Sequence, residues 1–218
     1  MIFDWEFAAE ILPQFGPALW ITIQATMAGT AIALTLGLVL ALLRRSPATP
    51  VAWCTAGFID FVRSTPLLVQ LYFLFYVLPE FGIKLSPFAT GALGLGLHYA
   101  AYCSEVYRAG IESIPRGQWE AAAALNLGRI RTLTRIIVPQ AIPPVVPALG
   151  NYVIAMFKDT PLLSAITVLE LLQTAKIIGA ETFRYVEALT LVGILFLALS
   201  LASAAGVRRL EHRLRRED

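Results

Sequence analysis

The run ALWITIQATMAGTAIALTLGLVLALL, residues 18–43, contains no charged side chain and ends at Arg44-Arg45. A helix needs about 20 apolar residues to cross the hydrocarbon core of a bilayer, which is about 30 Å thick. The strands of a membrane barrel alternate apolar and polar residues over about 10 positions, and this run does not alternate. We therefore expect a transmembrane helix here, and an all-α integral membrane protein.

The composition of the whole chain agrees with this class. Apolar residues make up 57% of the 218 residues, charged residues only 15%, and the mean hydropathy is +0.69. A soluble domain carries about 25% charged residues. This run and the remaining apolar runs predict about five transmembrane helices in one transmembrane domain, residues 1–218, at roughly 18–43, 51–78, 88–111, 139–157 and 185–207.

The charges are unevenly distributed along the chain. No Lys or Arg precedes Arg44, whereas the C-terminal tail contains Arg208, Arg209, Arg213, Arg215 and Arg216. Lys and Arg are enriched on the cytoplasmic side of membrane proteins. We expect the N-terminus outside and the C-terminus inside, which requires an odd number of transmembrane helices. The same rule makes residues 112–138 a cytoplasmic loop, with Arg116, Arg129, Arg131 and Arg135.

Two predicted segments are irregular. The helix at 51–78 contains Arg63-Ser64-Thr65-Pro66, and proline disfavours helix in the residue before it, so a kink or break is expected there. Within 158–181 the apolar part, 162–172, is too short to cross a membrane. It fits a re-entrant or interfacial helix.

The cytoplasmic loop predicts a helix-turn-helix. Residues 117–128, GQWEAAAALNLG, are rich in alanine, the best helix former, and Pro115 suits a helix start. Asn126 and Gly128 tolerate the left-handed backbone of a helix end. A second helix, 129–138, would then lead to Pro139, where the fourth transmembrane helix starts.

Glu120-Ala121-Ala122, the turn and the Ile136–Pro139 segment together resemble the EAA loop of bacterial ATP-binding-cassette (ABC) import permeases. That family's pattern is Glu-Ala-Ala, three residues, Gly, nine residues and Ile-x-Leu-Pro. Asn126 stands at the Gly position, Val138 at the Leu position and Pro139 at the Pro. The resemblance implies a type I importer permease, whose loop docks on an ATPase subunit through Glu120, Ala121, Ala122, Asn126, Gly128 and Pro139.

The resemblance extends over almost the whole chain. RSTPLLVQ, residues 63–70, is similar to the Arg-Gly-Thr-Pro-Leu-Leu-Val-Gln segment of the polar amino acid (histidine, glutamine and arginine) permeases. EVYRAGI at 105–111 and KDT at 158–160 also match that group in order. Residues 150–161 look most like the ectoine and hydroxyectoine branch. The resemblance implies import of a polar amino acid or a related zwitterion across the bacterial inner membrane by alternating access.

The energy source is expected on other subunits. The sequence has no G-x-x-x-x-G-K-[ST] loop, so we expect no cofactor in this chain, no enzymatic activity of its own, and ATP and Mg bound by a partner. The resemblance implies an ABC ATPase dimer, a second permease subunit (a copy or a paralogue) and a periplasmic or lipid-anchored solute-binding protein. The lipid bilayer surrounds the chain, and no nucleic-acid partner or metal site is expected.

Polar residues within the predicted helices are candidates for the solute path, since charges there are costly and usually face a partner or cavity. The candidates are Arg63, Thr65, Gln70, His98, Tyr102, Glu105, Asn151, Lys158, Asp159 and Thr160. Lys158 and Asp159 would complement the two charges of a zwitterion.

Structural interpretations of the same residues stay open. Asp60 and Arg63 are three residues apart, and so are Glu105 and Arg108, so each pair could be an ion pair on one helix face; Glu105 could instead contact Arg63. His98 and Asn151 could hydrogen-bond to neighbouring helices, and Lys158-Asp159 could anchor a turn. Glu120 is either a solvated helix charge or a contact to an ATPase cation.

Two other functions were weighed against an ABC permease. An ion-coupled secondary transporter of small polar solutes would need ionisable pairs deep in several helices and often an internal repeat, and neither is evident. A membrane scaffold would not need proline-broken helices with polar residues at the breaks.

Overall fold

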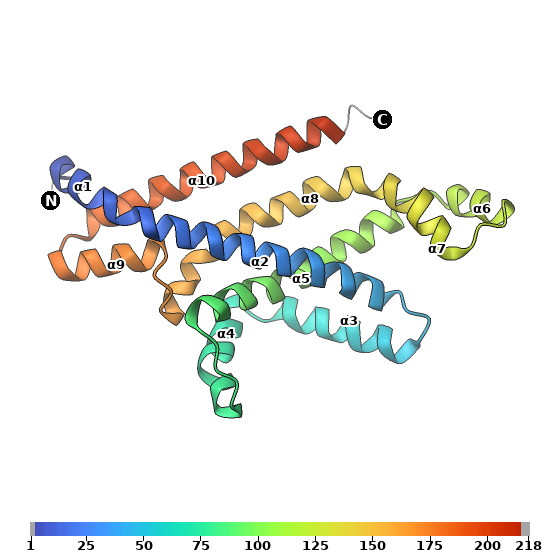
Figure 1. Cartoon of the computed structure of the whole chain (residues 1–218), viewed down its shortest axis with the longest axis horizontal. Helices are drawn as coiled ribbons and strands as arrows, with labels where there is room; N and C mark the ends of the chain where they lie inside the picture. Colours follow the sequence, from blue (N-terminus) through green and yellow to red (C-terminus); the bar gives the residue numbers. More distant parts are fainter. Residues whose placement is uncertain (1–2, 215–218) are drawn as a thin grey trace.

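The computed structural model describes residues 3–214 and consists of helices joined by short turns over that range (Figure 1). The α-helices are α1 Trp5–Ile11, α2 Phe15–Arg44, α3 Thr49–Ser64, α4 Leu67–Tyr72, α5 Pro87–Glu112, α6 Arg116–Ala124, α7 Arg129–Thr132, α8 Val138–Asp159, α9 Leu171–Thr182 and α10 Tyr185–Leu214. The predicted all-α class is confirmed. Arg215 and Arg216 of the basic tail lie outside the described residues.

Three helical stretches are long and apolar enough to cross a membrane: Trp5–Arg44, Arg129–Ile166 and Tyr185–Arg213. The bent pair Thr49–Ser64 and Leu67–Phe81 would be a fourth. Helix α5 has 26 residues, about 39 Å of helix, which is long enough to cross, but its polar side chains lower its hydropathy. The count of about five and the orientation therefore stay predictions.

Glycines allow α2 and α5 to pack closely along their length. A Cβ atom on Gly37 would lie 2.8 Å from the Cβ of Cys103, and one on Gly96 would lie 2.5 Å from the Cβ of Ile32. Small residues at helix interfaces let backbones approach in this way. Helix α5 also contacts α3 and α8, so its polar side chains face other helices.

The predicted break in the second apolar segment is confirmed. Helices α3 and α4 meet at 105°, with Thr65 and Pro66 in extended backbone conformations. The Gln70 amide Nε2 lies 2.8 Å from the Val62 carbonyl oxygen and 3.1 Å from the Thr65 carbonyl oxygen. One side chain therefore satisfies carbonyl groups that the proline leaves without helical partners.

Helix α8 begins differently from the prediction. We expected a loop helix at 129–138 and a new helix at Pro139, but the chain is helical without interruption from Arg129 to Ile166. A π-helical turn, Leu133–Ile137, lies just before Pro139. Its wider hydrogen-bonding pattern and the position of Pro139 in the first turn of α8 accommodate the proline. The end of the loop is thus continuous with α8 through this π-helical turn.

The segment after α8 is two short helices rather than one. A 3-10 helix, Thr160–Ile166, ends at Thr167 in a left-handed conformation (φ 63°), and α9 follows at Leu171. The prediction of one short apolar helix at 162–172 is therefore wrong, because the turn after Ile166 divides this range. Figure 1 shows α1 and α9 at one end of the molecule and α6 and α7 at the other, with α4 projecting to one side.

Candidate functional site

Three tyrosines and a histidine from α5 and α8 form an aromatic cluster in the middle of the bundle. The rings of Tyr102 and Tyr152 lie 5.6 Å apart, and those of Tyr99 and Tyr152 lie 6.0 Å apart. His98 lies 5.2 Å from Tyr102. Aromatic faces of this kind attract cations, so the cluster can receive a positively charged group as well as an apolar one.

Opposite charges flank this cluster. The Arg63 guanidinium lies over the Tyr102 ring, 5.4 Å from its centre, at the end of α3 where the chain breaks. On the other side Asp159 accepts a hydrogen bond of 2.6 Å from the Tyr99 hydroxyl. Asp159 is the last residue of α8. A cation and a carboxylate thus border one set of rings, in an arrangement that complements a zwitterion.

The break between α3 and α4 is tied to the cluster through Gln70. The His98 Nδ1 atom lies 3.2 Å from the Gln70 Oε1 atom, and the Gln70 amide group holds the broken backbone at Val62 and Thr65. The predicted hydrogen bond from His98 to a neighbouring helix is therefore present. The Thr65 hydroxyl donates to Phe61 and accepts from Gln70, which leaves it in a structural role.

One predicted interpretation is wrong in this geometry. Asp60 and Arg63 form no ion pair in the described chain, because the Arg63 side chain lies on Tyr102 instead. Thr160 is fully buried, and its hydroxyl donates to the Phe157 carbonyl, so a solute contact of Thr160 stays a prediction that no described contact supports. Lys158 is exposed, whereas Asp159 bonds to Tyr99, because consecutive helix residues point about 100° apart.

Asn151 is exposed on α8. The interhelical hydrogen bond that the sequence suggested for it does not form within the described chain. Its amide is free for a contact outside the subunit.

Glu105 belongs to an ion-pair cluster near the C-terminal end of α5. It pairs with Arg44 of α2 and, at 2.8 Å, with Arg108; the predicted Glu105–Arg108 pair is confirmed, and the alternative contact to Arg63 is not an ion pair. Arg108 also pairs with Glu112 at 2.5 Å. Two guanidiniums satisfy the Glu105 carboxylate, so we assign it to holding α2 against α5.

The loop that contains α6 and α7 presents a surface of small residues. Helix α6 starts after Pro115 as predicted, with Glu120 and Ala121 exposed and Ala122 buried. Asn126 adopts the left-handed conformation (φ 53°), which explains why Asn can stand at the family's Gly position. Gly128 does not adopt the left-handed conformation that the sequence suggested. Its backbone is extended, and it is the residue directly before α7. Trp119 anchors the loop on a small apolar cluster that includes Ile111 and Ile137.

Tyr99, Tyr152 and Arg44 were not among the predicted site residues. A signal was available for the tyrosines: Tyr99 and Tyr102 are three apart, and Tyr152 and Asp159 are seven apart, so each pair lies on one helix face. Arg44 carried no such signal, since its partner comes from another helix.

Comparison with known proteins gives a consistent result. The family model described as "Binding-protein-dependent transport system inner membrane component" matches residues 33–216. The probable amino-acid ABC transporter permease protein y4tG of Sinorhizobium fredii is 50% identical over 202 residues, covering 93% of this chain and 87% of that protein. The L-cystine transport system permease protein TcyB of Bacillus subtilis is 37% identical, covering 95% and 91%.

A solved structure is similar over nearly its full length. A chain of a crystal structure titled as an amino acid ABC transporter with histidines superposes with a TM-score of 0.92, at 32% identity, covering 98% of this chain and 100% of that one. A chain of an inward-facing MetNI methionine ABC transporter has a TM-score of 0.80 at 16% identity, covering 94% and 98%. The second likeness concerns the fold alone.

Proposed function

The chain belongs to the family of inner membrane components of binding-protein-dependent transport systems, and from that premise we propose that it is the permease subunit of an ABC importer for amino acids. It is a multi-pass protein of the bacterial inner membrane, without an ATPase site of its own. An ion-coupled secondary transporter is not favoured by this membership.

The proposed class of solute rests on one observation: Arg63 and Asp159 border the same tyrosine cluster. We propose that Arg63 receives the carboxylate of an amino acid or related zwitterion and that Asp159 receives its cationic group. The tyrosine faces support the cation, and Gln70 holds the helix break that presents Arg63. Asn151 and Lys158 remain weaker candidates, because no described contact directs either of them to the cluster.

Ectoine and hydroxyectoine are the narrower proposal. Both carry a delocalised cation and a carboxylate, which suits an aromatic cluster between a guanidinium and an aspartate. The resemblance of residues 150–161 supports it, while the named relatives are amino-acid and cystine permeases. A polar amino acid therefore remains the broader statement.

Coupling would run through the loop at the other end of α8. We propose that an ABC ATPase dimer docks on α6 at the exposed Glu120 and Ala121, with the Asn126 turn fixing the angle to α7. Ala122, a predicted docking residue, is buried within the chain and would instead hold α6 against its own loop. Gly128 and Pro139 shape the path from the loop into α8. A second permease subunit and a solute-binding protein would complete the importer, and ATP with Mg would be bound by the ATPase.

The coupling role is tested by Ala121→Asp and Glu120→Lys in the assembled importer. Both residues are exposed, so the chain should insert normally while ATPase co-purification and uptake fall at least about tenfold. Ala48→Asp, at an exposed alanine of the α2–α3 turn, is the matched control. Unchanged uptake in the loop variants would remove this role.

The solute class is tested by solute-stimulated ATPase activity in proteoliposomes. The complex with its binding protein is screened against cationic, anionic and neutral amino acids, ectoine and a sugar. Stimulation by a zwitterion supports the proposal; stimulation by the sugar alone would overturn it.

A further inference from the structure

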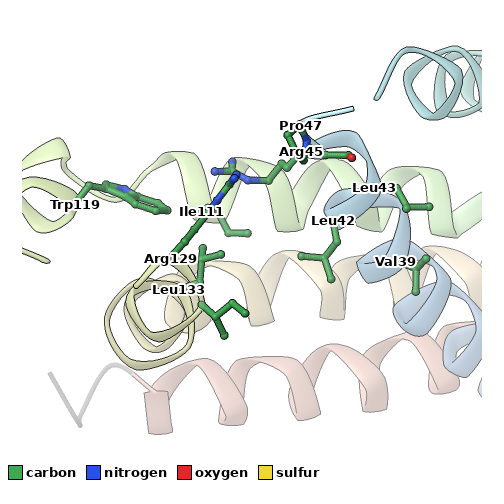
Figure 2. Close-up of a pocket in the computed structure, with 11 residues that line it drawn as sticks. Val39, Leu42, Leu43, Arg45, Pro47, Ile111, Trp119, Arg129 and Leu133 are labelled. Atoms are coloured by element: carbon green, nitrogen blue, oxygen red, sulfur yellow. The ribbon is translucent and has the colours of Figure 1, made fainter. Parts of the chain in front are cut away.

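A cavity of about 520 Å³ lies where the inner end of α2, the inner end of α5 and the start of α7 meet. Figure 2 shows Val39, Leu42 and Leu43 on one side of it and Leu133 and Trp119 on another. Its size is within the range of about 300–1,000 Å³ typical of small-molecule sites. None of its lining residues belongs to the aromatic cluster, and on α6 it is lined by Trp119 and not by Glu120 or Ala121.

The walls of this cavity are apolar and open to the surroundings. The exposed fraction of the side chain is 49% for Val39, 54% for Leu42 and 79% for Ile130. Helix α2 ends immediately afterwards, at Arg44-Arg45. The cavity therefore lies at the level where an apolar transmembrane helix leaves the bilayer, and Trp119 is a side chain suited to that level.

Two arginines border the cavity, and their charges are poorly neutralised. Arg129 has no ion-pair partner among residues 3–214, and Arg45 has only Glu112, at 3.9 Å. Glu112 is itself held by Arg108 at 2.5 Å. In Figure 2 the side chains of Arg45 and Arg129 point toward each other from opposite sides of the cavity.

The surplus of positive charge extends to the neighbouring ion-pair cluster. The ion pairs beside the cavity contain Arg44, Arg45, Arg108, Glu105 and Glu112, and Arg129 lines the cavity without a pair. In this set four cations face two carboxylates. Two guanidiniums directed at one space bind a shared anion well, because each can donate two hydrogen bonds to a phosphate.

We propose that this cavity binds an anionic phospholipid of the cytoplasmic leaflet. Its phosphate would lie between Arg45 and Arg129, and an acyl chain would cover Leu42, Leu43 and Leu133. A free phosphate would leave the apolar walls uncovered, and a neutral lipid would leave the arginines unpaired. Basic sites of this kind at the cytoplasmic face suit anionic lipid head groups. The lipid would join α2 to the loop that precedes α8.

Native mass spectrometry of the delipidated permease–ATPase complex tests the proposal, with phosphatidylglycerol and phosphatidylcholine of identical acyl chains as probes. We expect phosphatidylglycerol to bind at least about tenfold more tightly. Replacing both arginines, Arg45→Gln with Arg129→Gln, should weaken its binding about 30-fold, at roughly fivefold for each charge.

The matched control is Arg131→Gln with Arg135→Gln, which removes two charges from the same loop outside the cavity and should change binding less than about twofold. Leu133→Trp fills the cavity and should weaken binding about tenfold with both arginines kept. If the Leu133→Trp variant does not assemble, the comparison of the two double arginine variants is the test.

Three results would overturn the proposal: equal binding of the two lipids, equal losses in the two arginine pairs, or lipid binding to the free permease that disappears when the ATPase is added. The last result would identify the ATPase as the occupant. None of these results depends on which solute is transported.

Discussion

Replacing Asp159 by Asn tests whether its carboxylate binds the solute or only holds α8 against α5. The amide has nearly the same shape and still accepts the hydrogen bond from Tyr99, which is 2.6 Å long, so only the charge is lost. A hydrogen bond to a charged group contributes about 1.5–3 kcal/mol and a neutral one about 0.5–1.5 kcal/mol. The bond to Tyr99 should therefore weaken by about 1 kcal/mol, and the bond to the solute cation by a similar amount.

Two measurements follow from these energies. The lost Tyr99 interaction should lower the melting temperature of the purified complex by about 2–4 °C. The lost solute interaction should raise the KM for uptake about five- to tenfold in proteoliposomes that contain the ATPase and the binding protein. Lys158→Gln is the control, because Lys158 is exposed and lies beside Asp159 in the chain; it should change neither quantity.

A KM within about twofold of the wild-type value, together with the expected loss of stability, would show that Asp159 only holds α8 against α5. An equal rise of KM in Lys158→Gln would refute the assignment as well, since it would point to an effect of charge near the helix end rather than of a specific carboxylate.

Three further outcomes are expected. Gly37→Ala should lower the free energy of unfolding by about 1–3 kcal/mol in a chemical denaturation assay, because the new Cβ would lie 2.8 Å from Cys103 and 3.0 Å from the Ala100 carbonyl oxygen, whereas Gly193→Ala, with open space around it, should be neutral or stabilising; equal effects would contradict the close packing of α2 on α5. Gln70→Ala should destabilise the protein by about 2 kcal/mol and lower uptake, because the Thr65 carbonyl loses its donor and the Val62 carbonyl keeps only the 3.3 Å bond from the Thr65 hydroxyl. Gln24→Ala, at an exposed position of α2, is the control, and unchanged stability in Gln70→Ala would show that water binds these carbonyl groups instead. Burial raises the pKa of Glu170 from 4.5 to about 7, so the stabilisation that comes from its protonated form is complete below pH 4.5 and is lost as the pH rises through about 7; the melting temperature of the wild type relative to Glu170→Gln should therefore be higher at pH 5 than at pH 8, and a constant difference would argue against this titration.

The sequence predicted the long helices well because the bilayer imposes a simple rule. Residues 18–43 were expected to cross, and α2 spans Phe15–Arg44; the break at Pro66 followed from the geometry of proline. The Asn126 turn was likewise predicted from its tolerance of a left-handed backbone, and it has φ 53°. In each case a local property of the residue decides the local structure.

The errors concern partners and continuity, which local properties do not specify. Spacing along one helix suggested that Asp60 would pair with Arg63, but the guanidinium lies on Tyr102 of another helix. Pro139 suggested the start of a new helix, but the π-helical turn before it lets the helix continue through the proline. Tyr99 was not predicted as a site residue because its role depends on a hydrogen bond to Asp159 of another helix.

The length of α8 has a mechanical consequence. Its ends, Val138 and Asp159, are about 32 Å apart along the helix, so a tilt of about 5° around its midpoint would move each end by about 1.4 Å. A displacement of that size would break the 2.6 Å bond between Tyr99 and Asp159. Under the proposed coupling, a movement of the loop that tilts α8 by only this much would already release the Asp159 carboxylate from Tyr99.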